Sequence, residues 1–147
     1  MDLLSLLNEN ARLTNAQLAV MLGKTEEEVE KEIADYQQKG IIKGYKALIN
    51  WEKVDHHKTT AFIELKVQPK KESGFDEIAK KIMQFSKVES VYLMSGGFDL
   101  AVMVHGDSIQ DIAMFVAKRL SPLDSVLSTA THFILTRYKE GDVILTS

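Results

Sequence analysis

The sequence predicts an α+β protein with two units, because the spacing of its apolar residues changes near residue 50. Before that point apolar residues recur at every third or fourth position, as on the buried face of a helix. After it, stretches with apolar residues at alternate positions, typical of half-buried strands, are interleaved with further helical stretches. We therefore expect a helical domain over 1–50, a connector over 51–58 and an α+β domain over 59–147.

The composition is that of an ordinary globular protein, with 45% hydrophobic and 27% charged residues in 147. There is no cysteine, which excludes disulfides, thiolate zinc sites and a cysteine nucleophile. The first residues lack the basic and apolar stretches of a signal peptide, and no apolar run is long enough to span a bilayer. We expect a cytoplasmic protein with no metal, no cofactor and no membrane association.

Two capping signals on either side of a glycine predict two closely spaced helices. Thr14-Asn15-Ala16-Gln17 and Thr25-Glu26-Glu27-Glu28 both have the spacing of a capping box. Gly23, which lies between them, can adopt the positive φ that ends a helix. A short helix with Leu3, Leu4 and Leu7 on one stripe precedes the pair, and the helix after Thr25 carries the apolar stripe Val29, Ile33 and Tyr36 before Gly40.

Such a pair is typical of a helix-turn-helix, which presents its second helix to the major groove of DNA. The spacing alone fits an ordinary helical hairpin equally well. Residues 41–49 alternate around Gly44 and resemble the β-wing of a winged helix, with Lys43 and Lys46 directed at phosphates. The residues expected to contact DNA are Thr14, Asn15, Lys24, Thr25, Glu27, Glu28, Lys31, Lys43 and Lys46.

The charge of this part argues against tight DNA binding. The net charge of the chain is -3, and residues 1–50 hold six basic and eight acidic side chains. The outer face of the second helix of the pair carries Glu27, Lys31, Ala34 and Gln38, flanked by Glu28 and Asp35. We expect DNA binding that is weak per subunit and strongly dependent on salt, or that has been lost.

The second half of the chain has the order β-α-β-β-α-β. A strand begins near Ala61, a helix carries Phe75 to Phe85, and strands over 88–95 and 98–105 are joined by Gly96-Gly97. A helix from Ser108 to Leu120 and a strand over 126–138 follow. This order predicts a ferredoxin-like domain with an antiparallel sheet and both helices on one side of it.

The other face of that sheet is expected to be open and partly apolar. Phe62, Tyr92, Met94, Ala101 and Met103 lie on it, among Glu64, Asp99 and His105. An apolar surface of this kind needs a partner, and a second copy stacked face to face is the simplest one. The five apolar residues are therefore the expected homodimer interface.

Three segments together carry a resemblance to a known family. They are Asp2 to Thr14, the stretch Gly40-Ile41-Ile42-Lys43-Gly44-Tyr45-Lys46-Ala47, and Ser95-Gly96-Gly97-Phe98-Asp99-Leu100. With them the chain resembles, over nearly its whole length, the Lrp/AsnC (leucine-responsive and asparagine-responsive, feast/famine) transcription regulators. The chain departs from the family's pattern in its acidic recognition helix and in a first helix that begins almost at Met1.

The resemblance implies a regulator that binds double-stranded DNA through a winged helix-turn-helix. It also implies dimers that assemble into tetramers or octamers. The implied effector is a small molecule, typically an amino acid, bound near the glycine-containing hairpin.

An amino-acid site needs donors for a carboxylate and an anion for an ammonium group. Gly96 and Gly97 can expose backbone N–H groups, Asp99 supplies the anion, and Thr129 and Thr131 add hydroxyls. A plain hairpin turn followed by a strand-start aspartate remains an open alternative. The expected effector site is Met94, Ser95, Gly96, Gly97, Phe98, Asp99, Thr129 and Thr131.

No catalytic motif is present, so we do not expect an enzyme. Two alternatives stay open: an amino-acid-sensing assembly module that has lost DNA binding, and an enzyme like the tetrapyrrole decarboxylases that resemble this family. His56 and His57 are given no role, while His105 and His132 are expected to be hydrogen-bonded strand residues. Trp51 is expected to anchor the connector.

Overall fold

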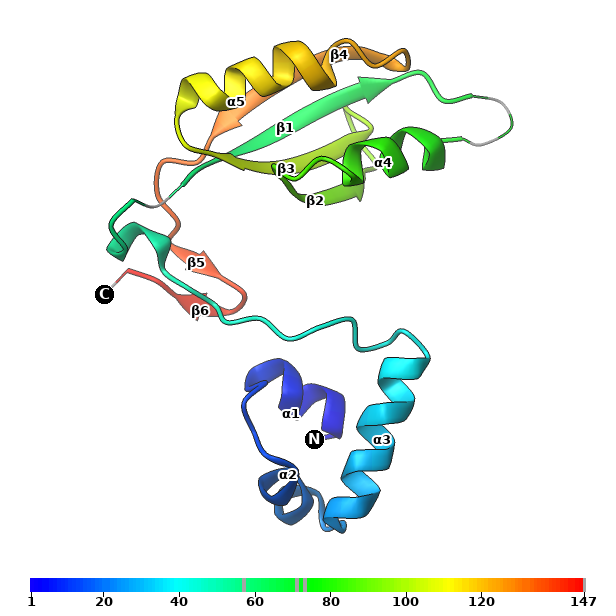
Figure 1. The fold of residues 1–147 in the computed structure, drawn as a ribbon, viewed down its shortest axis with the longest axis vertical. Coiled ribbons are helices and arrows are strands. Elements are labelled where there is room, and N and C mark those ends of the chain that lie inside the picture. The colour runs from blue at the N-terminus through cyan, green and yellow to red at the C-terminus, as the bar shows by residue number, and fades with distance from the viewer. Residues whose placement is uncertain (57, 71, 73, 147) are drawn as a thin grey trace. The chain divides into compact units, whose positions relative to one another are not determined.

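The computed structural model describes residues 1–56, 58–70, 72 and 74–146. The chain divides into two compact units, Met1–Leu48 and Ile49–Ser147 (Figure 1). Each unit has an apolar core of its own. His57 lies outside the described residues.

The first unit consists of three helices around a small leucine-rich core. They are α1 (Leu3–Glu9), α2 (Asn15–Leu22) and α3 (Glu26–Gln38). Ile33 and Tyr36 of the predicted stripe pack against this core, whereas Leu4 is only half-buried and Leu6 takes the inward position instead. The buried members are Leu3, Leu6, Leu7, Leu18, Ala19 and Val29.

The predicted helix ends are present, with one difference. Thr14 and Gln17 form the full capping box of α2, which ends at Gly23 with φ 65°. Thr25 caps α3 by accepting from the Glu28 N–H at 3.1 Å, but the Glu28 carboxylate accepts from the Thr25 hydroxyl at 3.3 Å. The second box is therefore only half formed, because its glutamate meets the threonine side chain.

The predicted β-wing is wrong: residues 41–50 contain no strand. After α3, Gly40 adopts φ 73°, and the Ile41 N–H donates a hydrogen bond back to the Tyr36 carbonyl at 2.9 Å. A wing needs two strands joined by a loop of at least about two residues. The stretch around Gly44 is too short to fold back on itself, and the described part of this unit offers no other strand for pairing.

The second unit has the predicted β-α-β-β-α-β order and a four-stranded antiparallel sheet with strand order β2-β3-β1-β4. After the 3-10 turn η1 (Trp51–Lys53), the strands are β1 (Thr59–Val67), β2 (Val88–Leu93), β3 (Leu100–Gly106) and β4 (Val126–Phe133). The helices are α4 (Asp76–Met83) and α5 (Ile109–Phe115), and a π-helical turn, η2 (Val116–Leu120), extends α5. No helix among the described residues is long and apolar enough to cross a membrane.

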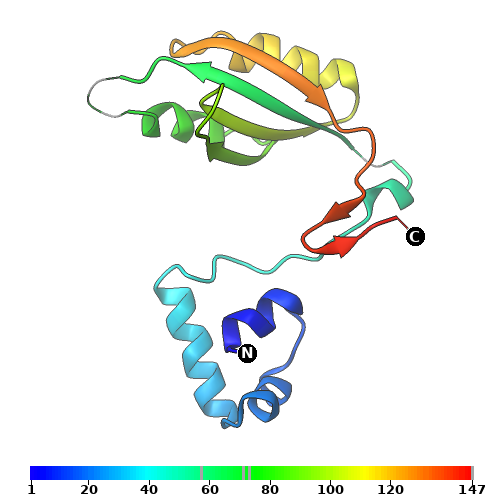
Figure 2. The same cartoon turned by 180° about the vertical axis from the view of Figure 1, so that it is seen from behind.

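Helices α4 and α5 cover one face of the sheet, as the two opposite views in Figures 1 and 2 show. Ala61, Ile63 and Leu65 of β1 point into this layer and are fully buried, which confirms the predicted alternation. Phe62 and Glu64, at the alternate positions of β1, point to the other face. Figure 2 shows none of the described helices over that face of the sheet. The sheet therefore has one covered face and one open face.

The last predicted strand is too long. Strand β4 ends at Phe133, and a short hairpin follows, made of β5 (Lys139–Glu140) and β6 (Val143–Ile144). Its turn places Gly141 at φ 52° and Asp142 at φ 66°. A Gly-Asp pair of this kind is a turn signal that the sequence analysis missed.

Asp111 ties the end of β3 to the start of α5. Its Oδ2 accepts from the Lys87 ammonium at 2.6 Å and from the Asp107 N–H at 3.0 Å. The hydrogen bond from Lys87 holds the pKa of this carboxyl below its usual value. The Asp111 carboxylate is thus fixed directly against Gly106, where an added Cβ would lie 2.6 Å from Oδ2 and 2.9 Å from Ile112 Cγ1.

Replacing Gly106 by alanine is therefore expected to lower the free energy of unfolding by about 1–3 kcal/mol, the usual cost of overpacking. Chemical denaturation followed by circular dichroism measures the change. Gly97→Ala is the matched control in the same unit, because a Cβ there meets nothing within 4 Å. Equal stability of the two variants would show that Asp111 and Ile112 can move aside.

Candidate functional site

All the residues expected to contact DNA are exposed on the first unit. Thr14 and Asn15 lie at the start of α2, and Lys24 to Lys31 cover the start of α3. Lys43 and Lys46 lie on the extended segment after α3. The outer surface of α3 is thus polar apart from Ala34, with Val29 on the opposite, buried side.

The lysines around α3 are paired with carboxylates of the same helix. Lys24 Nζ lies 2.7 Å from Glu32 Oε2, and this hydrogen bond raises the pKa of Lys24. Lys31 lies 3.5 Å from Glu27, and Lys39 lies 2.8 Å from Asp35. Each pair reduces the field that its lysine exerts on a nearby phosphate. Lys43 and Lys46 form no ion pair with any described residue.

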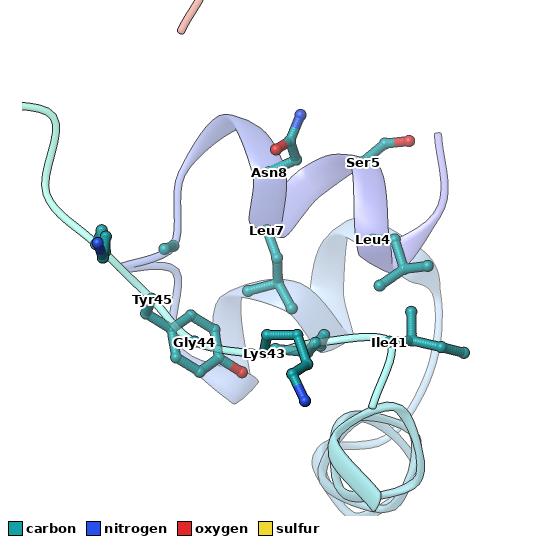
Figure 3. Close-up of a pocket in the computed structure, with 11 residues that line it drawn as sticks. Leu4, Ser5, Leu7, Asn8, Ile41, Lys43, Gly44 and Tyr45 are labelled. Atoms are coloured by element: carbon teal, nitrogen blue, oxygen red, sulfur yellow. The ribbon is translucent and has the colours of Figure 1, made fainter. Parts of the chain in front are cut away.

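A groove of about 540 Å³ lies between α1 and the segment after α3. Figure 3 shows Leu4 and Leu7 of α1 on one wall and Lys43 and Tyr45 on the other. The Tyr45 hydroxyl accepts from Gln37 Nε2 at 3.3 Å, which links this segment to α3. The lining of the groove includes Lys43 and Lys46 and contains no carboxylate or histidine.

The predicted hairpin joins β2 and β3 across residues 95–99. The Met94 N–H donates to the Asp99 carbonyl at 2.8 Å, and Gly96 has φ 151°. Met94, Ser95, Gly96 and Gly97 are exposed. Phe98 is half-buried and packs edge-on against Phe62, with ring centroids 5.9 Å apart.

Asp99 has a structural partner. Its Oδ2 accepts from the Val67 N–H at 2.9 Å, and its own N–H donates to the Leu65 carbonyl at 2.9 Å. These bonds extend the pairing of β1 and β3 beyond the irregularity that β1 shows between Lys66 and Val67. The contacts are those of the strand-start aspartate that the sequence left as an alternative.

The strand register corrects the expected position of Thr131. Thr131 pairs with Ile63 and Thr129 with Leu65, so both lie on the helix-covered side of the sheet. Ser128, Ala130 and His132 share the open face instead. A shift of one residue exchanges the two faces of a strand, and the length of the loop before β4 sets that shift.

A hollow of about 360 Å³ lies on the open face beside the hairpin. Glu64 is flanked there by two small neighbours, Ala101 on β3 and Ala130 on β4, which leave room above the sheet. The hollow is lined by Glu64, Lys66, Gly97, Phe98, Ser128, Thr129 and Ala130. Five of the expected effector residues, Met94, Ser95, Gly96, Asp99 and Thr131, are not part of the lining.

Glu64 and Lys66 place opposite charges two residues apart on one face of β1. Glu64 Oε2 lies 3.0 Å from His132 Nε2, and 32% of the glutamate side chain is exposed. A carboxylate and an ammonium at this spacing complement the two charges of an α-amino acid. The sequence analysis missed the pair, although the alternation of β1 already assigns both residues to the same face.

Most of the predicted dimer residues lie on the open face, but Ala101 is not accessible. Tyr92 and Met94 are exposed, and Phe62 and Met103 are half-buried. Ala101 is only 1% exposed because its small side chain lies between the larger Glu64 and Tyr92. His105 and His132 are bonded to Glu89 and Glu64, as expected of strand histidines.

Trp51, which is expected to anchor the connector, is 47% exposed. Within the described part of the chain, no cluster of three or more metal-ligating side chains occurs.

Comparison with known proteins gives the family. The model of the Lrp/AsnC ligand binding domain matches residues 60–144, more than half of the chain. The HTH-type transcriptional regulator YugG of Bacillus subtilis is 48% identical over 147 residues, covering 99% of this chain and 89% of its own. The HTH-type transcriptional regulator LrpA of Pyrococcus abyssi is 28% identical, with 93% of this chain and 94% of its own covered.

Solved structures have the same fold. E. coli AsnC superposes with a TM-score of 0.71 at 22% identity, covering 93% of this chain and 90% of its own. A Neisseria meningitidis transcriptional regulator in complex with L-Met gives 0.73 at 23% identity, with coverages of 92% and 86%. Together with the family match and the 48% identity, the fold leads to one conclusion: the chain belongs to the Lrp/AsnC family of transcription regulators.

Proposed function

We propose that the chain regulates transcription by binding DNA through α2 and α3 as a helix-turn-helix, without a β-wing of its own. The observation that carries the proposal is the capped turn from Gly23 to Thr25, after which α3 presents an exposed and mainly polar surface. Helices that read DNA place such a surface in the major groove. Glutamates on it can accept from the amino group of cytosine.

The phosphate contacts are proposed to come mainly from Lys43 and Lys46. The lysines of α3 are compensated by Glu27, Glu32 and Asp35. With few uncompensated cations, each subunit gains little from releasing counterions. Tight binding then requires two copies acting together on neighbouring half-sites.

The full chain is expected to retard DNA from its own upstream region at low salt, with affinity falling as salt rises. Lys43→Gln should reduce the slope of log affinity against log salt concentration by about 1 for each subunit bound to the DNA. The reason is that each variant subunit makes one phosphate contact fewer. Lys139→Gln, which removes an exposed lysine of the second unit, is the control. No retardation at low salt, with or without amino acids, would favour an assembly module that has lost DNA contact.

The open sheet face is proposed to join two copies. Tyr92 and Met94 are exposed there beside Phe62 and Met103, on the part of the face that β1, β2 and β3 form. Two sheets that stack through such faces bury their apolar side chains against each other. Tetramers and octamers built from these dimers, as in the family, are part of the same proposal.

Met103→Glu is expected to convert the dimer to a monomer, because it places a charge at the centre of the buried face. Sedimentation velocity measures the molecular mass. Leu135→Glu is the matched control, since Leu135 is 88% exposed and lies outside the sheet. A monomeric wild-type chain, or a dimer that Met103→Glu leaves intact, would refute this interface.

The hollow beside the hairpin is proposed to bind an amino-acid effector. Lys66 would take the carboxylate, Glu64 the ammonium group, and Phe98 would contact the side chain. In this proposal Asp99 supports the hairpin through the Val67 N–H, and Glu64 rather than Asp99 takes the ammonium group. Two structures with this fold, from Neisseria meningitidis and M. tuberculosis, are complexes with L-methionine, which is therefore the first probe.

Glu64→Gln is expected to weaken L-methionine binding at least tenfold in titration calorimetry, because the ammonium loses its counter-charge. Asp99→Asn should change it little, since the amide oxygen can still accept from the Val67 N–H. Thr131→Val, on the covered face, is the control. If Asp99→Asn abolished binding and Glu64→Gln left it unchanged, the ammonium group would be bound by Asp99 and not by Glu64.

A further inference from the structure

A second cavity of the same unit lies near the start of β1, away from the glycine hairpin. Its volume is about 290 Å³, close to the lower limit of small-molecule sites. Four separate stretches of the chain form it: the turn η1, the start of β1, the β2–β3 edge and the segment after β4. Six of its lining residues are Trp51, Lys58, Thr60, Glu89, His105 and Arg137.

Arg137 is held in one orientation at this cavity. Its Nη2 donates to the Thr60 hydroxyl at 3.0 Å, and its backbone N–H donates to Glu52 Oε1 at 3.0 Å. Thr60 is 7% exposed and is the one buried polar residue among those the structure describes. The arginine side chain itself is 22% exposed. Thr60 therefore orients a guanidinium that is already largely withdrawn from water.

The protein leaves most of this guanidinium without an acceptor. A guanidinium carries its N–H donors in a planar fork that matches a carboxylate or phosphate. Among the described residues, one hydrogen bond to Thr60 and a contact of 4.0 Å with Glu140 Oε2 are its polar partners. An anion in the cavity would replace water on the N–H groups that the protein leaves unbonded.

The other charges of the lining favour the same kind of ligand. Lys58 adds a second cation. Glu89 is the carboxylate of the lining, and its Oε1 lies 3.0 Å from His105 Nδ1, so the neighbouring imidazole already engages it. The positive groups therefore outweigh the negative one inside the cavity.

Trp51 gives the site a preference for flat molecules. Nearly half of its surface is exposed although the indole is the largest apolar side chain of the unit, and it forms a wall of the cavity. An indole exposed beside cations provides a stacking surface for an aromatic ring. A ring on Trp51 with its acidic group towards Arg137 would use both features at once.

We propose that this cavity is a second ligand site, which binds a small aromatic or heteroaromatic anion. Arg137 and Lys58 hold the carboxylate or phosphate, and Trp51 stacks on the ring. The site is separate from the amino-acid hollow, because the two linings share no residue. Thr60 and His105 pair at the end of the open sheet face, so occupancy of the site also bears on the adjoining dimer surface.

The single tryptophan of the chain makes the test specific, because Trp51 is the only source of tryptophan fluorescence. The full chain is titrated with nicotinate and with nicotinamide, which share a ring but differ in charge, and with AMP and adenosine for the phosphate case. We expect saturable quenching by nicotinate or AMP, at least tenfold tighter than by its uncharged counterpart. The anion that binds identifies the head group.

Arg137→Gln is expected to weaken that binding at least tenfold, while Lys139→Gln leaves it unchanged. Lys58→Gln is the second test should Arg137→Gln fail to fold, as judged by circular dichroism. Glu64→Gln must leave the quenching intact, which separates this site from the effector hollow. Quenching that rises linearly, is equal for charged and uncharged rings, or survives both cation substitutions in folded protein overturns the proposal.

Discussion

The second unit depends on the alternation of β1, the central strand that pairs with β3 on one edge and β4 on the other. Its inward residues are fully buried, and its outward residues include Glu64 and Lys66. A shift of one residue would drive both charges into the apolar layer, at a cost of several kcal/mol for each unpaired ion. The register is therefore fixed, and with it the positions of the hollow, the hairpin and the open face.

In the first unit the surface charge is the constraint. Its exposed surface is richer in carboxylates than that of most DNA-binding domains, and carboxylates repel phosphates. Its glutamates serve the helix itself: Glu26, Glu27 and Glu28 lie in the first turn of α3, where negative charge is favoured by the helix dipole. Glu27, Glu32 and Asp35 then fix the lysines around them. Helix stability and attraction to phosphates thus compete for the same side chains, which is why the proposed DNA binding relies on two copies acting together.

Local signals in the sequence were enough to predict the order of elements, the caps at Thr14 and Thr25, and the faces of β1. The antiparallel sheet with both helices on one face was also predicted, but finer features that depend on particular contacts between distant residues were not. The face of Thr131 depends on how β4 meets β1, and the role of Asp99 depends on the N–H of Val67, 32 positions away. The prediction of a wing was wrong because alternation in 41–49 indicates an extended chain but does not show that another strand is available to pair with it. The terminal hairpin was missed although Gly141-Asp142 marks its turn.

The amide of Asn50 donates to the carbonyl of Leu145 at 3.1 Å, so the second unit is entered and left at one place. A module whose two ends meet can be joined to other proteins without disturbing its interior. Residues 49–147 therefore suit grafting after a different helix-turn-helix domain, or insertion into a surface loop of another protein. The splice points should leave the hydrogen bond between Asn50 and Leu145 intact.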